Sequence, residues 1–250
     1  MTNRSYKWIV LSLMVIFGMV SAILAQQPAG GAAAPGVPAG AGRGGAGAGG
    51  GRGGGGRGGA PIALVFKETW QNTSTMLPMS QASVVNPDLE LKMYGSGKTD
   101  FSVTNEGNMP HIWTGECESS CALTLRHKEN FVDLTGNARI KWSMKTSGFH
   151  EIRPILKLAD GTYLIGDHVD AETVGYRESE FYISQVHWLK ADVAFKVLTK
   201  GRVLATVDLS KVDEIGFADL TPGSGHGDGG YSDMAWIEVY GKAVKRDAAK

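Results

Sequence analysis

A glycine-rich loop near the end of the chain carries residue types suited to binding an ion or a polar ligand. The loop, Thr221–Asp233, holds aspartate, serine and one histidine among its glycines, and it lies between two apolar runs, Val212–Leu220 and Met234–Tyr240. It is not expected to be helical, because its glycines cost backbone entropy and Pro222 lacks a backbone N–H. Main-chain carbonyls and short carboxylates in such a loop can approach a ligand closely. The sequence therefore predicts a binding loop held between two strands.

Carboxylates in and beside this loop could together coordinate calcium, which takes six to eight oxygen ligands. The candidate metal ligands are Glu68, Asp219, Asp228, Asp233 and Glu238. Their spacing matches no fixed calcium motif. The alternative is that these acids solvate the loop and close turns by bonding to nearby backbone groups. Calcium is thus an expected structural cofactor that depends on these carboxylates converging.

Aromatic and histidine side chains supply a second kind of candidate site. A sugar site combines a flat apolar ring, which contacts the C–H face of a pyranose, with hydrogen-bonding groups for the hydroxyls. The candidates for ligand contact are Trp188, Tyr163, His168, His226 and Tyr231. Trp142 lies on an alternating apolar run and is predicted to be a core residue. For each of the other aromatic residues, packing in the core is the alternative to ligand contact.

The elements expected to position these residues have the sequence pattern of β-strands. Ala138, Ile140, Trp142 and Met144 alternate with polar residues, which indicates a half-buried antiparallel strand. No window has a helical period. Further runs of strand type are Ile62–Phe66, Leu89–Met93, Phe101–Val103, Ala122–Leu125, Ile152–Leu158, Tyr163–Ile165, Phe181–Leu189, Asp192–Thr199 and Val203–Val207. The turn Asp160-Gly161 predicts a hairpin, and the whole pattern predicts an all-β sandwich.

Two similar turns precede two of these strands. Asp133-Leu134-Thr135 and Asp208-Leu209-Ser210 place a small polar residue where it can bond its own backbone and close the turn. Together with the segment Asp233–Gly241, which reads DMAWIEVYG, they resemble the galactose-binding-like jelly roll of many carbohydrate-binding modules. The resemblance covers about 110 residues and implies an antiparallel jelly-roll β-sandwich, often with one calcium ion. It also implies a sugar site in loops or on a concave face.

Two weaker resemblances favour an enzyme instead. Glu151-Ile-Arg153 and Gln185-Val-His187 resemble the alginate-lyase jelly roll, in which an arginine and a glutamine–histidine pair bind a uronate and help abstract a proton. Leu64–Trp70 resembles the opening strand of sugar-processing domains with a concanavalin-like sandwich. No close pair of carboxylates at strand positions is present, as a retaining glycosidase would need. An enzyme that processes polysaccharides is the alternative hypothesis to a non-catalytic binding module.

The first 60 residues differ in composition from the rest. Residues 1–25 have a basic start and an apolar run, which predicts a signal peptide with cleavage after Ala25 or Ala22; a retained membrane anchor is the alternative. Residues 26–60 are rich in glycine, alanine and proline, which predicts a disordered linker. The folded domain is then expected at 61–245 with a tail at 246–250. The protein is expected to be secreted or periplasmic, with no membrane contact after cleavage.

The overall neutrality of the chain conceals an acidic domain. Residues 1–60 hold five of the 25 basic residues and no acid, so the remainder carries 20 basic and 25 acidic residues, a net charge of −5. That balance argues against nucleic acid as a partner. Cys117 and Cys121 are the only cysteines, and in an oxidising compartment they are predicted to form a local disulfide.

These observations favour a secreted carbohydrate-binding module without turnover. A polysaccharide-processing hydrolase or lyase is the first alternative. The second is a structural or interaction protein of the cell envelope, which would present a large exposed apolar patch.

Overall fold

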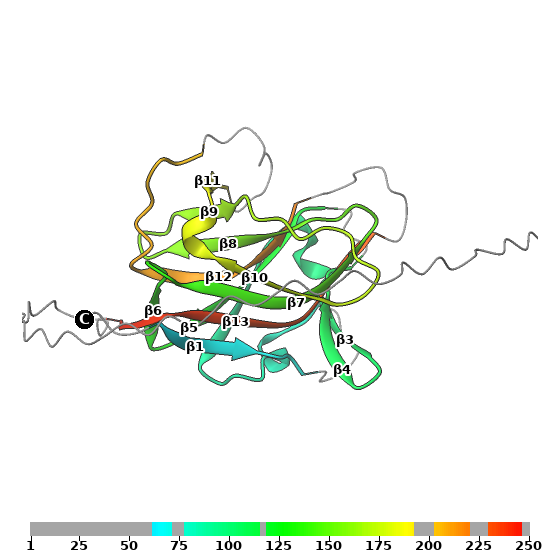
Figure 1. Cartoon of the computed structure of the whole chain (residues 1–250). Helices are drawn as coiled ribbons and strands as arrows, with labels where there is room; N and C mark the ends of the chain where they lie inside the picture. The colour runs from blue at the N-terminus through cyan, green and yellow to red at the C-terminus, as the bar shows by residue number, and fades with distance from the viewer. Residues whose placement is uncertain (1–61, 72–77, 116–118, 193–202, 221–229, 247–250) are drawn as a thin grey trace, which may run out of the picture. The chain divides into compact units, whose positions relative to one another are not determined.

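The computed structural model describes 13 strands arranged as an antiparallel β-sandwich, which confirms the predicted all-β class (Figure 1). The described residues are 62–71, 78–115, 119–192, 203–220 and 230–246. The strands are β1 (Ala63–Glu68), β2 (Leu89–Gly95), β3 (Ser102–Glu106), β4 (Met109–Trp113), β5 (Cys121–His127), β6 (Asn130–Asp133), β7 (Arg139–Ser147), β8 (Ile152–Leu158), β9 (Tyr163–Gly166), β10 (Arg177–Tyr182), β11 (Trp188–Ala191), β12 (Val212–Asp219) and β13 (Tyr231–Lys245). Three 3-10 turns join them, and these are η1 (Gln81–Ser83), η2 (Ser96–Thr99) and η3 (Ile183–Gln185).

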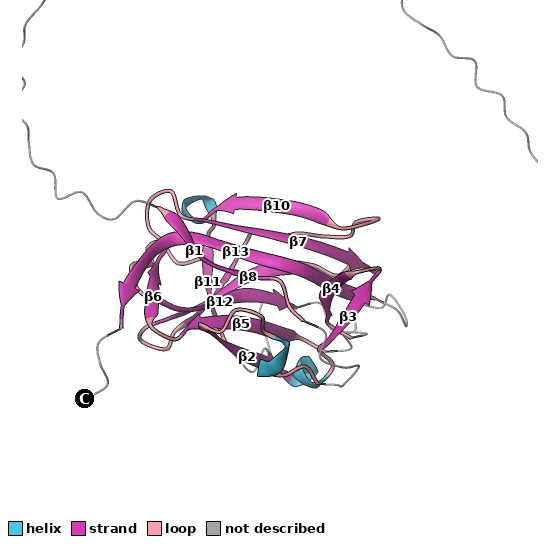
Figure 2. Cartoon of the chain, turned by 90° about the horizontal axis from the view of Figure 1, so that it is seen from below, coloured by secondary structure: helices cyan, strands magenta, loops and turns pink. Residues whose placement is uncertain are grey.

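Two layers share the long strand β13. In the first layer β10, β7 and β13 lie side by side, and β1 and β4 pair with different parts of β13, with β3 beside β4 (Figure 2). The second layer has the order β2-β5-β12-β8-β9-β11. Strand β6 pairs with one end of β12 and with the last residues of β13, so it connects the layers.

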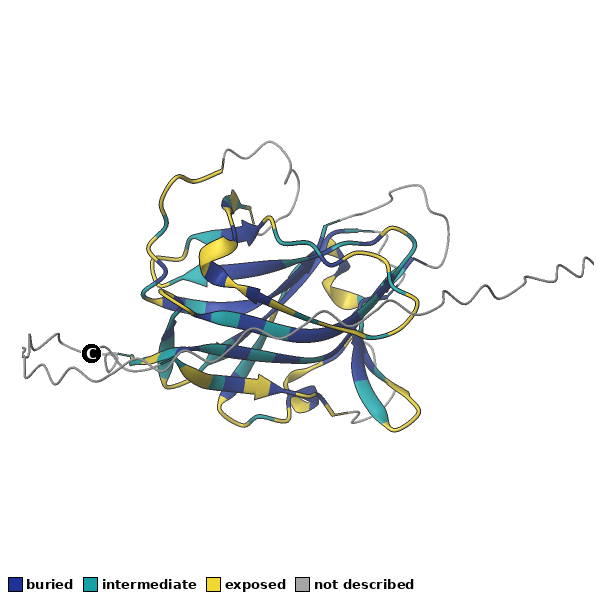
Figure 3. Cartoon of the chain, viewed as in Figure 1, coloured by how far each residue is buried: buried dark blue, intermediate teal, exposed yellow. Residues whose placement is uncertain are grey.

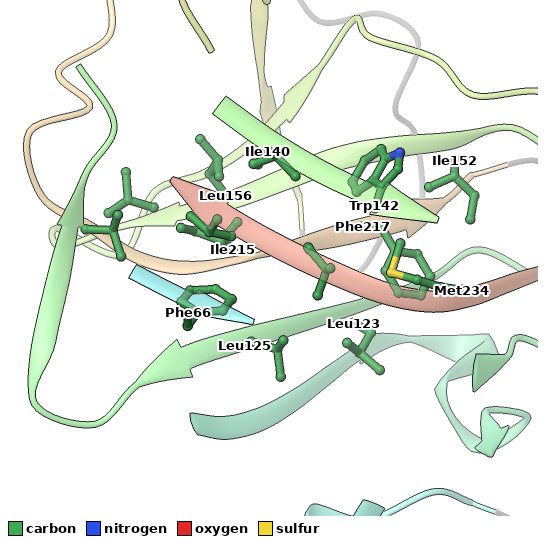
Figure 4. Close-up of a cluster of buried hydrophobic side chains, with 14 of the residues drawn as sticks. Phe66, Leu123, Leu125, Ile140, Trp142, Ile152, Leu156, Ile215, Phe217 and Met234 are labelled. Carbon is green, nitrogen blue, oxygen red and sulfur yellow. The ribbon is translucent and has the colours of Figure 1, made fainter. Parts of the chain in front are cut away.

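The core lies between the layers because alternate residues of each strand point inward. Trp142 of β7 is fully buried, as predicted, and Phe217 of β12 faces it from the other layer (Figure 4). Ile237 and Val239 of β13 are buried in the same cluster. Side chains from both layers thus form one main core.

The two predicted turns form and lie together. The Asp133 carboxylate accepts hydrogen bonds from the Thr135 backbone N–H at 2.8 Å and from its hydroxyl at 2.6 Å, and Asp208 accepts from the Ser210 N–H at 2.9 Å. The Leu134 N–H donates to the Leu209 carbonyl at 2.9 Å, which joins the turns directly. Both leucines are buried, so each turn also delivers one side chain to the core.

The strands from β7 to β9 match the prediction, including the hairpin at Asp160-Gly161. The single strand predicted for Phe181–Leu189 is wrong. There β10 ends at Tyr182, the chain turns through η3, and β11 begins at Trp188. Ile183 and Val186 are buried through this turn, so the apolar run serves the core without being extended throughout.

The segment predicted as strand Val203–Val207 is also not a strand. It forms one isolated bridge, between Val203 and Leu189. Its residues are mostly exposed or half-buried, so no alternating face is available to anchor a ladder.

Several predictions concern residues beyond the described ranges. They include the signal peptide, the linker, most of the strand Asp192–Thr199, and Cys117, so the disulfide to the buried Cys121 stays a prediction. Within the described part of the chain, no helix has the length and apolar character needed to cross a membrane.

Candidate functional site

The site lies on the outer face of the second layer, which is the face turned away from the core. Ile215 and Phe217 of β12 point inward, so Glu214, Gly216 and Ala218 point outward. Small apolar residues of this face form a cluster separate from the main core, and half-buried residues pack on it. The members are Ala122, Ile155, Ile165 and Ala218, with Tyr94, Tyr163, Ala191 and Leu220 packed against them. Figure 3 shows the central strands buried and the exposed residues gathered mainly in loops.

The outer face is concave. Tyr94 lies on β2 and Tyr163 on β9, and three strands separate them in the sheet. A flat sheet would hold their backbones about 19 Å apart, at roughly 4.8 Å per strand. Their ring centroids are nevertheless 5.4 Å apart at an interplanar angle of 74°, and their hydroxyl oxygens are 3.1 Å apart. The two side chains span only part of this distance, so we infer that the sheet curves toward this face and lets the two rings meet.

A buried carboxylate fixes the two rings. Glu214 is 1% exposed and accepts hydrogen bonds from the Tyr94 hydroxyl at 2.7 Å, the Thr124 hydroxyl at 2.6 Å and the Lys157 ammonium at 2.8 Å. The Tyr163 hydroxyl in turn donates to that of Tyr94. Burial, with the bonds to Tyr163 and Glu214, raises the pKa of Tyr94 far above its usual value. Tyr94 therefore stays protonated and remains a donor to Glu214.

The ammonium of Lys157 remains charged in this network. Burial alone would lower the pKa of Lys157, but its hydrogen bond and attraction to Glu214 raise it overall. The charges of Lys157 and Glu214 thus offset each other beneath the aromatic pair.

Two arginines that border the outer face are also paired with carboxylates. Arg126 lies 3.0 Å from Glu90 and 3.0 Å from Asp213, and Arg153 lies 3.2 Å from Glu151. Because each of these cations has a carboxylate partner, this part of the face presents hydrogen-bonding groups without a strong net positive or negative potential.

Asp213 gives a prediction on pH dependence. Burial would raise its pKa, but hydrogen bonds from Arg246 and Arg126 outweigh this and lower it. A lowered carboxylate pKa contributes stability that is present above the unfolded value, about 3.9, and is lost as pH falls through the folded value. We expect Asp213→Asn to lower the free energy of unfolding by about 1–2 kcal/mol at pH 7. In urea titrations the difference from wild type should shrink below about pH 4; a difference that is constant with pH would contradict this assignment.

A shallow hollow adjoins Tyr163. It has a volume of about 380 Å³ and is lined by the β8–β9 turn and by β11, with Asp160, Lys190 and Asp192 among its polar residues. A larger hollow, about 700 Å³, lies in the first layer beside Arg139 and Tyr182. Both hollows offer a place for a ligand, and the smaller one is lined in part by Tyr163.

A second buried network anchors both ends of the glycine-rich loop. Asp219 ends β12 and Ser232 lies near the start of β13, and the Ser232 hydroxyl donates to the Asp219 carboxylate at 2.8 Å. His150 Nδ1 lies 2.9 Å from the same carboxylate oxygen. A nucleophilic triad would instead need the hydroxyl bonded to the imidazole and open to substrate. These three residues are buried, so the network is structural.

The structure does not bring the predicted ligand residues together. Tyr163 lies on the outer face, but Trp188 is 4% exposed and packs in the core. His168 stacks on Phe181 with centroids 3.9 Å apart and lies 3.0 Å from Asp170. The other two predicted residues are placed elsewhere: Tyr231 is half-buried in the first layer, and His226 lies outside the described residues.

Tyr94 was not among the predicted site residues. The run Leu89–Gly95 alternates, and this pattern places Glu90, Lys92 and Tyr94 on one face. That signal could have marked Tyr94 as outward-facing, but the sequence alone could not show that it meets Tyr163.

The predicted metal ligands that are described each have protein partners. Glu68 accepts backbone N–H bonds from Trp70, Val85 and Asn86 at 2.7–3.0 Å. Asp219 belongs to the His150 network, and Asp228 lies outside the described residues.

The other two carboxylates are held by lysines. Glu238 accepts from Lys67 and from Tyr240, both at 2.8 Å. Asp233 lies 3.3 Å from Lys145, and burial raises the pKa of Asp233, which disfavours the anion that a metal requires. In the described ranges, no three histidine, cysteine or acidic side chains group closely enough to hold an ion.

Comparisons with known proteins find similarity only among solved structures. No protein-family profile and no curated protein matches the sequence. The family 11 carbohydrate-binding module of the cellulosomal cellulase Lic26A-Cel5E of Clostridium thermocellum is similar over 76% of this chain and 97% of its own, with 10% identity and a TM-score of 0.39. A family 29 carbohydrate-binding module complexed with cellulohexaose is similar over 66% of this chain and 89% of its own, with 11% identity and a TM-score of 0.38. PfGH50B matches 64% of this chain at 11% identity and a TM-score of 0.37, and this chain spans 24% of it.

Proposed function

We propose that this chain is an exported module that binds a carbohydrate chain on the concave outer face without turning it over. The observation that carries the proposal is the Tyr94–Tyr163 pair, fixed above the buried Glu214. Aromatic rings offer the apolar surface that packs against the C–H face of a sugar, and nearby polar groups pair with its hydroxyls. Because Glu214 orients both rings before binding, little side-chain entropy remains to be lost.

The hydrogen bonds and charge partners of the carboxylates on this face support binding without catalysis. A glycosidase needs one carboxylic acid with a raised pKa and a second free carboxylate beside it. Here Glu214 is held by three donors, and hydrogen bonds and charge attraction from Arg126 lower the pKa of Glu90 despite its partial burial. Glu90 therefore lacks the raised pKa that such an acid needs, and Glu214 is engaged by its three donors.

One arrangement favours the lyase alternative. His187 is largely exposed, and its Nδ1 lies 2.7 Å from the Asp167 carboxylate, which orients the ring as a general base requires. Product formation from a uronate polymer would select this alternative over binding alone.

Affinity electrophoresis and calorimetry with neutral and uronate polysaccharides test the proposal. We expect Tyr163→Ala to weaken binding about tenfold or more, because an aromatic contact and its packing are both removed. The matched variant is Tyr182→Ala, since Tyr182 is 42% exposed and lines the larger hollow in the other layer. Its binding should stay within about twofold of wild type, as expected of a residue away from the ligand.

The two variants locate the ligand. Binding lost in Tyr182→Ala and kept in Tyr163→Ala would move the site to the larger hollow, and no binding by wild type would refute the proposed function. A parallel series with chelator tests the calcium expectation, which predicts weaker binding when the ion is removed.

A further inference from the structure

The larger hollow, on the first layer, combines a single charged side chain with several neutral polar groups. Its volume of about 700 Å³ is typical of small-molecule sites. Arg139 of β7 is the only ionic residue among the described residues that line it. The other lining residues are Ile62, Asn137, Tyr182, Ser184 and Gln185. The hollow therefore offers one positive charge, hydrogen-bonding groups and one aromatic ring.

The strand register places Arg139 between two tyrosines. Tyr182 of β10 and Tyr240 of β13 pair with Arg139 from the two sides of β7 (Figure 2). Their neighbours Phe181 and Val239 are buried, so the side chains of this row point outward. The Arg139 guanidinium lies 4.0 Å from the centroid of the Tyr240 ring, whereas Tyr182 is 42% exposed. Stacking on Tyr240 thus holds the guanidinium in place, and Tyr182 stays open to a ligand.

The Arg139 guanidinium has hydrogen-bonding capacity that the protein does not use. The Glu180 carboxylate lies 2.7 Å from Arg139 Nε, but the two groups are not aligned as a hydrogen bond. Nε is buried, and within the described ranges it has no hydrogen-bond partner. The Glu180 side chain is 41% exposed, and an ion pair of this kind contributes little, so another acceptor can displace it. A guanidinium binds a carboxylate through two parallel N–H groups, which makes Arg139 suited to a planar anion.

The neutral groups around Arg139 suit hydroxyls rather than a simple anion. Asn137 and Gln185 supply amides, Ser184 supplies a hydroxyl, and all three are exposed. Such groups pair with sugar hydroxyls, and the ring of Tyr182 offers an apolar surface for the C–H face of a sugar. A lone inorganic anion would need only the guanidinium. The whole lining therefore matches a ligand with one carboxylate and several hydroxyls.

We propose that this hollow is a second ligand site, which binds the acidic sugar unit of a saccharide. Arg139 holds the carboxylate, Gln185 bonds to hydroxyls, and Tyr182 packs against the sugar ring. The site goes beyond the proposed function and does not depend on it, because the Tyr94–Tyr163 pair belongs to the other layer. Since the hollow selects an acid, Tyr182→Ala keeps its role as the control for neutral polysaccharides.

Calorimetry on the whole protein tests this site with short oligomers of a uronic acid and with neutral oligomers of equal length. We expect the acidic oligomer to bind, and Arg139→Lys to weaken it about tenfold or more, because lysine keeps the charge but loses the paired N–H groups. The matched control is Arg177→Lys, since Arg177 lies at the other end of β10, about 17 Å from Tyr182. Its affinity should stay within about twofold of wild type.

Gln185→Ala provides a second variant in case Arg139→Lys does not fold. Gln185 is exposed, so its replacement should leave Tm unchanged and weaken acidic oligomers about fivefold, through one lost hydrogen bond. Unchanged affinity in both variants would overturn the proposal, and so would equal binding of acidic and neutral oligomers. If acetate or sulfate binds as tightly as the uronate oligomer, the hollow takes only an anion and the saccharide assignment is wrong.

The results for the two sites are separable. Acidic oligomers that are lost in Tyr163→Ala and kept in Arg139→Lys would bind on the outer face of the second layer, which refutes the second site and not the proposed function. Acidic oligomers that depend on Arg139, together with no polysaccharide binding at Tyr163, would refute the proposed function alone.

Discussion

Glu214→Ala is expected to lower the free energy of unfolding by about 3 kcal/mol and to remove most glycan binding. The variant leaves the Lys157 ammonium and two hydroxyls, those of Tyr94 and Thr124, without their shared acceptor. Loss of one partner of a buried ion pair costs more than the pair contributes, because the remaining charge stays partly desolvated. Asp213, 3.6 Å from the Lys157 ammonium, compensates only part of this loss. Binding falls as well, because Tyr94 and through it Tyr163 lose the group that orients them. Urea unfolding and calorimetry measure the two effects.

Glu90→Ala is the matched control. Glu90 borders the same sheet and pairs with Arg126, but it is partly exposed, so its loss should cost less than about 1 kcal/mol. Similar losses for the two variants would show that Glu214 is not the organising group of the face.

Local pattern accounts for much of the fold. The alternation of Ile140, Trp142 and Met144 identifies β7 and its buried side, because residue parity along an extended chain decides which face a side chain takes. The turns at Asp133 and Asp208 were predictable for a similar reason, since each depends on a bond between residues two positions apart.

The prediction of Trp188 as a ligand residue shows where the alternation of residues along a strand is insufficient to decide which face a side chain takes. It assumed an extended strand through Phe181–Leu189, but η3 interrupts that strand and changes which residues face inward. Trp188 then packs in the core. A short 3-10 turn inside an apolar run leaves no clear trace in the sequence.

The site itself depends on contacts between distant segments. Tyr94 and Tyr163 are 69 residues apart, and Tyr94 and Glu214 are 120 apart. Their meeting requires the strand order and the curvature of the sheet, neither of which a local pattern contains. The acidic residues show the same limit: Glu68 and Asp219 have the composition of metal ligands, but the structure pairs them with backbone N–H groups and with His150 and Ser232.

Asp219→Ala is expected to lower the free energy of unfolding by about 3 kcal/mol, because two buried polar groups, on His150 and Ser232, lose their common partner. Asp219→Asn should cost less, since its amide oxygen can still accept from Ser232. Urea unfolding measures both, and an alanine variant as stable as wild type would show that the network does not anchor the loop.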